Sequence, residues 1–310
     1  AKRLPELAAA EGMPAIGLTD TNNLFGALEF AETCAKKGVQ PVMGLTLSVA
    51  TVEARPGEKA PPPAPLALLA QDRAGWLNLM ALASSAHLDT GASDRPHVPL
   101  ARLEAHAGGL ICLTGGADGP LGREIAAGHE EAARALARRL AAAFPDRLYV
   151  ELTRHGTDDT GLRAGEAATE PGLLALAYAL ELPIVATNHV QFEGAEMFEA
   201  HDALLCIGEG RYVNESDRRV LTPEYRFKTA GEMCARFADL PEALETTVEI
   251  AMRCAVRPRT HPPILPRFAE DEVEELRRQS RERLAARLAV IPHAAAVEDY
   301  EARLERELSI

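Results

Sequence analysis

Several short apolar runs of this chain end in residues whose side chains could bind a metal ion. Asp20 follows one run, Glu151 and His155 follow another, and His189 follows a third. Carboxylates and imidazoles that converge from several strand ends are typical ligands of divalent metal ions. Each candidate stands alone in the sequence, however, and a turn capped by an aspartate explains Asp20 equally well. Only contacts between distant segments could join these residues into one site.

Other chemistry-bearing residues carry weaker signals. The remaining histidines have no metal-binding spacing such as His-x-x-x-His, and no glycine-rich nucleotide-binding motif follows any apolar run. Trp76 lies at helical spacing from Leu79 and Met80, which indicates core packing. The five cysteines are widely spaced with no Cys-x-x-Cys pair, which favours reduced, buried thiols in a cytosolic protein.

The elements that would position these residues alternate between strand and helix. Strands are predicted at residues 15–18, 41–49, 66–70, 110–113, 148–152 and 184–186. Helices are predicted at 24–37, from an N-cap at Asp72, at 121–144 with a break near Gly128, and at 172–180. Such alternation predicts parallel strand–helix–strand units in an α/β barrel, with an open doubly wound sheet as the alternative. In a parallel barrel, functional residues lie at the carboxyl ends of the strands.

The last third of the chain is predicted to be helical, at 197–207, 230–237, 241–254, 271–288 and 296–308. Within the helix at 241–254 and its start, Leu240, Leu244, Val248 and Ala251 are spaced by three and four residues, so this stripe is predicted to pack on the barrel. Proline-rich stretches at 51–65 and 257–268 predict a loop and a linker. We expect a domain boundary near Pro262, and the chain resembles a fragment cut within helices at both ends.

The charge balance restricts the kind of partner. A net charge of −13 over 310 residues argues against a main DNA-binding surface, because phosphate contacts need clustered Lys and Arg. The acidic balance favours a protein partner or a small-molecule role. No apolar run approaches the roughly 20 residues that a membrane span needs, and the charged first residues do not form a secretory signal.

Eight segments together resemble the PHP domain of bacterial DNA polymerase III alpha subunits, in the same order and spacing. They are GMPAIGLTDTNNLFGALEF, GVQPVMGLTLSV, LLAQDRAGWLNLMALAS, GLICLTGGADGPLG, FPDRLYVELTRHG, LPIVATNHVQF, EAHDALLCIGEG and FADLPEALETTVEIAMRC. The resemblance implies a distorted (β/α)7 barrel of α/β class over residues 1–262, without the family's first His-x-His strand. It also implies that residues 263–310, beginning near PPILPRF, lead into the polymerase palm.

The resemblance also implies that the metal site is degenerate. Family members with an intact site carry metal ligands at positions where this chain has other residues: Thr21, Thr46, Pro65, Gly116 and Gln191. Proline and glycine have no side-chain donor, and a hydroxyl or an amide is a weak neutral ligand. Asp20 is retained, and His189 stands where the family has a carboxylate. We therefore expect a vestigial pocket that binds no metal.

The function that the resemblance implies belongs to a larger protein. The expected role of this segment is a non-catalytic scaffold in a cytoplasmic DNA-directed DNA polymerase. It would support the palm and thumb and dock the proofreading exonuclease subunit among other holoenzyme subunits. The Mg²⁺ of DNA synthesis, and most DNA contacts, would lie outside it. Two alternatives are a metal-dependent phosphoesterase or 3′–5′ exonuclease, and the same domain of an error-prone paralogue.

Overall fold

The computed structural model describes residues 2–52, 61–91, 94–158, 161–263 and 265–310. Contacts divide the chain into two compact units, Ala1–Arg259 and Thr260–Ile310. The predicted loop at 51–65 lies largely outside the described residues, as does one position of the predicted linker. The assignment of residues 1–262 to a PHP domain without its first strand, and of 263–310 to the approach to a polymerase palm, stays a prediction.

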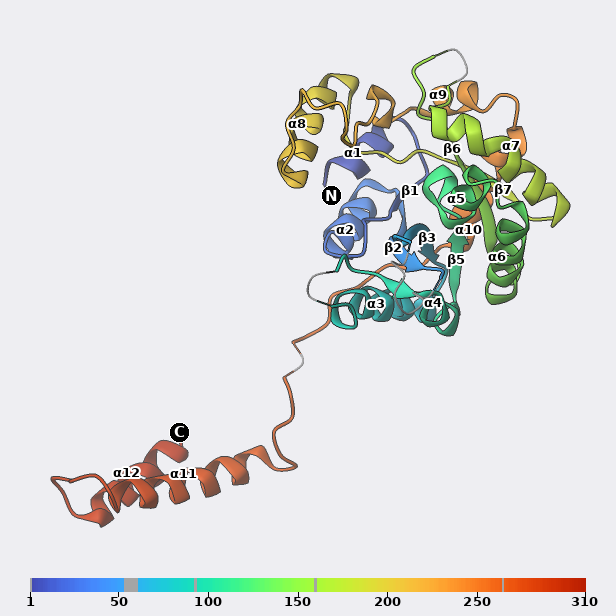
Figure 1. Ribbon diagram of the computed structural model, residues 1–310. Coiled ribbons are helices and arrows are strands. Elements are labelled where there is room, and N and C mark those ends of the chain that lie inside the picture. Colours follow the sequence, from blue (N-terminus) through green and yellow to red (C-terminus); the bar gives the residue numbers. More distant parts are fainter. Residues whose placement is uncertain (1, 53–60, 92–93, 159–160, 264) are drawn as a thin grey trace. The chain divides into compact units, whose positions relative to one another are not determined.

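The first unit is built on a sheet surrounded by helices (Figure 1). The strands in the described residues are β1 (Ala15–Leu18), β2 (Gln40–Ala50), β3 (Ala64–Ala70), β4 (Val98–Pro99), β5 (Leu110–Leu113), β6 (Leu148–Thr153) and β7 (Ile184–Thr187). The helices are α1 (Arg3–Ala10), α2 (Ala27–Lys37), α3 (Arg73–Leu88), α4 (Leu100–Ala105), α5 (Pro120–Ala126), α6 (Glu130–Ala143), α7 (Ala164–Ala179), α8 (Phe198–Glu209), α9 (Ala230–Arg236) and α10 (Pro241–Arg253). Short 3₁₀ turns are η1 (Gly116–Asp118), η2 (Ala195–Met197) and η3 (Pro223–Tyr225).

The strand order is β1-β2-β3-β5-β6-β7, with β4 paired to β2. The sheet curls into a half-barrel with helices around it, so the predicted α/β barrel class is confirmed (Figure 1). The prediction of six parallel strands was wrong, because β3 runs antiparallel to both β2 and β5. A parallel return requires a long crossover, usually a helix, whereas an antiparallel partner can be reached through a loop. The described residues between β2 and β3, at 51–52 and 61–63, are not helical.

Both faces of the sheet are buried. In β3, Leu66 and Leu68 pack with the inner sides of α3 and α4, while Ala67 and Leu69 face the concave side. This burial on two faces explains why the strand reads as an unbroken apolar run. The concave face is filled by side chains from β2, β3, β5, β6 and β7, together with Ile250 of α10. The half-barrel therefore has a packed interior, and its functional groups must lie at the strand ends.

Helix α10 packs on the sheet along a side that follows the predicted stripe only in part. Leu240, Ala243 and Ile250 are buried, whereas Val248 is 59% exposed. Of the predicted stripe, Leu240 is buried and Leu244 and Ala251 are partly buried against the core, whereas including Val248 was wrong. The predicted stripe did not include Ala243, which is fully buried. A small side chain at this position allows the helix to approach the sheet closely.

Local signals at helix ends were more reliable. The carboxylate of Asp72 caps α3 by accepting a hydrogen bond of 2.9 Å from the Gly75 amide. Gly38 ends α2 in the left-handed region at φ 72°, as a C′ glycine does. Helix α7, however, starts at Ala164 and continues through Pro171, so the predicted start at 172 was wrong. Strand β4 and helix α4 were not predicted.

The second unit contains a pair of helices, α11 (Glu272–Leu288) and α12 (Val297–Leu308). Arg281 of α11 and Glu305 of α12 form a two-pronged ion pair at 2.7 and 2.9 Å. The carboxylate of Asp271 caps α11 by accepting hydrogen bonds from the amides of Val273 and Glu274. Across the described residues of both units, no helix is long and apolar enough to cross a membrane.

Candidate functional site

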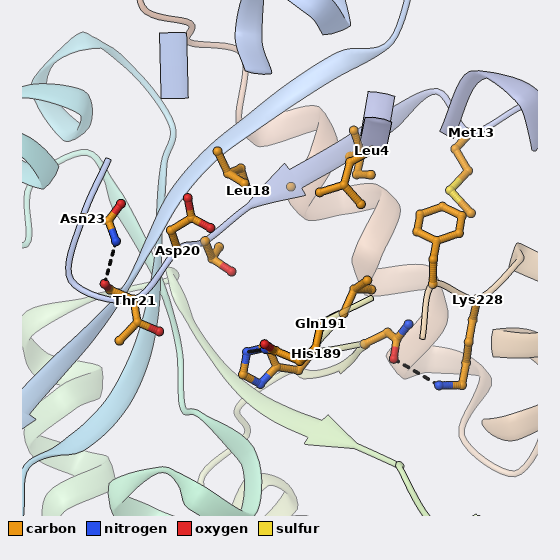
Figure 2. A pocket seen from close by; sticks show the side chains of 15 residues that line it. Leu4, Met13, Leu18, Asp20, Thr21, Asn23, His189, Gln191 and Lys228 are labelled. Carbon is orange, nitrogen blue, oxygen red and sulfur yellow. Dashed lines mark hydrogen bonds between the residues drawn. The ribbon is translucent and has the colours of Figure 1, made fainter. Parts of the chain in front are cut away.

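A cavity of about 630 Å³ opens between the carboxyl ends of β1 and β7. Four of the predicted site residues line it together: Asp20, Thr21, His189 and Gln191 (Figure 2). Leu4, Met13, Ile16 and Phe227 add an apolar wall, and Asn188 and Lys228 add polar groups. The two ends of the sheet thus bring residues about 170 positions apart into one pocket, as expected for strand carboxyl ends in an α/β fold.

Thr46, Pro65 and Gly116 do not line this cavity. The Thr46 hydroxyl donates a hydrogen bond of 2.8 Å to the Thr19 carbonyl, and Thr46 pairs with Thr21 in an isolated bridge. Pro65 lies in β3 opposite Ser48 of β2. Gly116 is buried at φ 57°, where a β-carbon would lie 3.2 Å from the Thr153 hydroxyl. The seven predicted positions are therefore divided between the cavity and the packed rim of the half-barrel.

The Asp20–Asn23 turn has a structural explanation. Asn22 adopts the left-handed conformation at φ 55° and is buried. Its side-chain carbonyl accepts a hydrogen bond from the Ser48 amide at 2.8 Å, and its side-chain amide donates to the Ser48 hydroxyl at 3.0 Å. These bonds fasten the turn to β2, which leaves Asp20 exposed at the edge of the cavity.

Beside the cavity lies a buried His155–Glu166 pair. The imidazole and the carboxylate meet at 2.9 Å between His155 Nδ1 and Glu166 Oε1. Glu166 Oε2 accepts hydrogen bonds from the amides of His155 and Arg163. Burial raises the pKa of Glu166, but these hydrogen bonds outweigh it and lower the pKa to about 2. Burial lowers the pKa of His155, against the raising effect of the Glu166 carboxylate that faces its Nδ1.

Tyr225 covers the other side of His155. The two rings stack at 4.0 Å between centroids and 14° between planes. His155 Nε2 accepts a hydrogen bond of 3.3 Å from the His189 amide, which joins β6 to the segment after β7. Both imidazole nitrogens of His155 are therefore occupied. Desolvation, together with His155 and Arg219, lowers the pKa of His189 to about 4, so that ring is neutral at physiological pH.

Glu151 is a second buried carboxylate at the strand ends. Its Oε1 accepts a 2.6 Å hydrogen bond from the Thr187 hydroxyl, and its Oε2 accepts one of 2.9 Å from the Gly115 amide. Its own amide donates to the Thr114 hydroxyl at 3.0 Å. Burial raises the pKa of Glu151. The side chain connects the ends of β5, β6 and β7 rather than facing the cavity.

Lys228 closes the other side of the cavity and is almost fully buried. Its ammonium donates to the Asn188 side-chain carbonyl at 3.2 Å (Figure 2), and it also bonds the Glu224 carbonyl. The Glu224 carboxylate lies 3.5 Å away and pairs with Arg236 at 2.7 Å. Burial lowers the pKa of Lys228 to about 8, against the raising effect of Glu224. This network holds the segment before α9 against the end of β7.

The donor set at the cavity does not fit a metal ion. Within the described ranges, no three His, Cys, Asp or Glu side chains lie close enough together to hold one. His189 Nε2 is 2.8 Å from the Gln191 side-chain amide, which donates to it. Both nitrogens of His155 are also used within the protein. Asp20 remains as a single exposed carboxylate, which does not make a coordination shell.

Sequence reasoning did not find Glu166, Tyr225 or Lys228. Glu166 lies in the first turn of α7, before residue 172 where the predicted helix began, so its position relative to His155 could not be inferred. One local signal lies next to Lys228 in the sequence. Thr229 and Glu232 form a capping box, which marks the start of α9 directly after the lysine. Tyr225 gave no local signal, because its stacking partner lies 70 positions earlier in the chain.

Comparison with known proteins agrees with this architecture. A family model described as "PHP domain" matches residues 1–155, which is half of the chain. The chain belongs to the PHP domain family. The resemblance inferred from the eight sequence segments is therefore confirmed.

Relatives of this PHP domain include DNA polymerase III alpha subunits from several bacteria. The one from Caulobacter vibrioides is 44% identical over the whole chain, which covers 27% of that relative. The one from Rickettsia bellii is 36% identical over the whole chain and 26% of the relative. The one from Vibrio cholerae is 36% identical over 99% of the chain and 26% of the relative. The chain thus spans about a quarter of the length of these relatives.

Proposed function

We propose that this PHP domain serves as a non-catalytic scaffold within a cytoplasmic replicative DNA polymerase III alpha subunit. DNA synthesis, with its Mg²⁺, would belong to parts of the polymerase outside the 310 residues. The domain would support the palm and thumb and dock the proofreading exonuclease subunit and other holoenzyme subunits. The three relatives described above, each named DNA polymerase III subunit alpha, support this identity of the parent protein.

One observation carries the non-catalytic part: the buried polar groups at the strand ends form hydrogen bonds and ion pairs within the protein. His155 is held by Glu166, Glu151 by Thr187 and Gly115, and Lys228 by Asn188 and Glu224. Such closed contacts stabilise a fold, whereas a phosphoesterase needs ligands that remain available to metal and substrate.

Metal analysis of the purified chain tests the vestigial pocket. After mild dialysis we expect no stoichiometric zinc or manganese, because Thr21, Thr46 and Gln191 offer neutral donors and Pro65 and Gly116 offer none. Stoichiometric metal that is lost in Asp20→Ala or His189→Ala variants would contradict the proposal. It would favour the metal-dependent phosphoesterase alternative.

The scaffold role is tested in the complete polymerase. Asp20→Ala and His189→Ala should leave the primer-extension rate and the affinity for the exonuclease subunit within about twofold, less than 0.5 kcal/mol by the rate relation. Ile250→Ala, which weakens the packing of α10, should lower thermal stability and polymerase activity together. If the pocket variants lose activity while Ile250→Ala does not, the scaffold proposal is wrong.

A further inference from the structure

A histidine lies within the apolar side by which helix α8 packs on the rest of the first unit. Phe198, His201 and Leu205 are spaced by three and four residues, so they share one side of the helix. Phe198 and Leu205 pack against a small buried cluster that includes Phe192. The His201 ring lies beside Phe192, with 5.2 Å between the ring centroids. The apolar contact of α8 is thus interrupted by one ionisable ring.

One ring nitrogen of His201 is unpaired. The ring as a whole is partly exposed, but its Nδ1 atom is buried and has no hydrogen-bond partner among the described residues. A neutral imidazole suits this position, because its single proton can sit on Nε2 and leave Nδ1 without one. In the imidazolium both nitrogens carry a proton, so Nδ1 would become a buried charged donor without an acceptor. The packed arrangement of α8 therefore favours the neutral ring.

The charged groups near His201 act in the same direction. Burial lowers the pKa of His201 below its ordinary 6.5, Arg219 in the loop after α8 lowers it further, and Asp202 on α8 opposes both. The Asp202 carboxylate is itself held by a two-pronged ion pair with Arg218, at 2.6 and 2.8 Å. Its attraction for a second cation is correspondingly reduced.

The segments that pack around α8 carry three further carboxylates. Glu193, before η2, pairs with Arg3 at 2.7 Å. Glu196 of η2 is exposed, so water and salt screen its charge. Glu224 of η3 pairs with Arg236 at 2.7 Å. These carboxylates are thus either paired with an arginine or screened, and a proton on the histidine of α8 gains little from them.

We propose that His201 acts as a pH-sensitive switch for the packing of α8: protonation of its ring weakens the contact between the helix and the Phe192 cluster. When α8 opens, Nδ1 reaches water and the imidazolium is solvated. The open form binds the proton with the ordinary pKa of about 6.5, and the closed form binds it with a lower pKa. The closed form is therefore fully favoured above pH 6.5 and loses stability as pH falls below it. This inference stands apart from the proposed function, because it depends only on how α8 is packed.

Hydrogen exchange of the α8 amides in the purified chain measures this opening, with each rate divided by the intrinsic exchange rate at the same pH. We expect the protection of α8 to fall about three- to tenfold between pH 7.5 and pH 5.5, because one proton bound on opening changes the equilibrium by up to about tenfold per pH unit. His201→Phe keeps an aromatic ring against Phe192 but cannot titrate, so its α8 protection should stay within about twofold over this range. His201→Gln is also uncharged and should behave in the same way.

The matched control is His129→Gln, which removes a histidine whose side chain is 65% exposed and lies 3.0 Å from the Glu124 carboxylate. This variant should keep the acid sensitivity of α8. The amides of α10, which contains no histidine, serve as a reference within each protein. The buried histidines His155 and His189 are present in every variant, so their effects cancel when the proteins are compared at the same pH.

Three results would overturn the proposal. The first is α8 protection that does not change between pH 7.5 and pH 5.5 in the unmodified chain. The second is equal acid sensitivity of α8 in the unmodified chain and in the His201 variants. The third is loss of the acid sensitivity in His129→Gln. Circular dichroism checks the fold of each variant, and should His201→Phe disturb it, His201→Gln makes the same comparison with a smaller side chain.

Discussion

At the scale of single residues, this domain uses ionisable groups mainly to fasten segments to one another. Arg154 at the end of β6 is the most connected example. Its guanidinium pairs with Glu170 of α7 at 2.6 Å and with Asp239 before α10 at 2.7 Å, and it lies 4.6 Å from the centre of the Phe237 ring. Arg154 and Glu170 are both nearly inaccessible to solvent. One arginine thus connects a strand end, a helix and the loop that leads to α10.

Replacing Arg154 by Ala should lower the free energy of unfolding by about 3–5 kcal/mol, because it leaves the Glu170 carboxylate buried without its partner. Urea unfolding followed by circular dichroism measures the change. Lys37→Ala is the control, because Lys37 forms a solvent-exposed ion pair with Glu6 at 3.3 Å, and water and salt screen such pairs. Equal losses in the two variants would show that burial does not matter at Arg154.

Lys228 gives a pH-dependent prediction. Its pKa is lowered from 10.5 to about 8, so between these values the unfolded chain binds more protons than the folded one. The free energy of unfolding should therefore rise as pH increases from about 8 to 10.5, by up to about 3 kcal/mol from this group. In Lys228→Met this part of the rise should be absent. The measurement is urea unfolding at several pH values in both proteins, and parallel curves would contradict the assignment.

At the scale of elements, a helix can have more than one possible buried side. In α10 the sequence offers a stripe through Leu244 and Val248 and a second one through Ala243 and Ile250. The structure buries the second most deeply, with Ile250 at the concave face of the half-barrel beside Tyr149 and Val185. Leu244 is partly buried at the edge of this contact, and Val248 is exposed. The choice depends on which side chains fit the concave sheet face, and that information lies in the strands rather than in the helix.

Truncation along α10 distinguishes the two stripes. Ile250→Ala should cost about 2–5 kcal/mol of unfolding free energy, because it leaves a cavity in the packed interior. Val248 lies two residues before Ile250 on the exposed side of the helix, so Val248→Ala should cost less than about 0.5 kcal/mol. Thermal or urea unfolding of both variants decides the matter. A larger loss for Val248→Ala would restore the stripe predicted from the sequence.

At the scale of the whole molecule, charge and composition set what the chain can bind. The 46 acidic side chains outnumber the 33 Lys and Arg side chains, which gives the chain its net charge of −13. Such a surface suits protein contacts better than contacts with phosphates.

The isolated chain should bind duplex DNA no more tightly than about 1 µM near 150 mM salt, because it lacks the clustered basic residues that release counterions. It should also fail to extend primers. Anisotropy titration with a labelled duplex and a primer-extension assay are the measurements. A sub-micromolar dissociation constant with a steep salt dependence would mean that a local basic patch outweighs the overall charge.

The sequence by itself determined the features that depend on near neighbours. The bounds of β1 and β5, the Asp72 cap, the Gly38 terminus and the break near Gly128 all follow from local hydrogen bonding and backbone sterics. The ordered segments also determined the family. These signals are readable because each acts within a few residues of its cause.

Only the tertiary structure decided the direction of β3, the buried side of α10 and the composition of the site. An apolar run has no direction, so the sequence could not show that β3 is reversed. Asp20 and His189 meet because β1 and β7 are the two ends of one curled sheet, and His155 meets Glu166 because α7 starts early enough to place that carboxylate beside it. Contacts between distant segments depend on how all the elements pack together, and no local pattern contains that information.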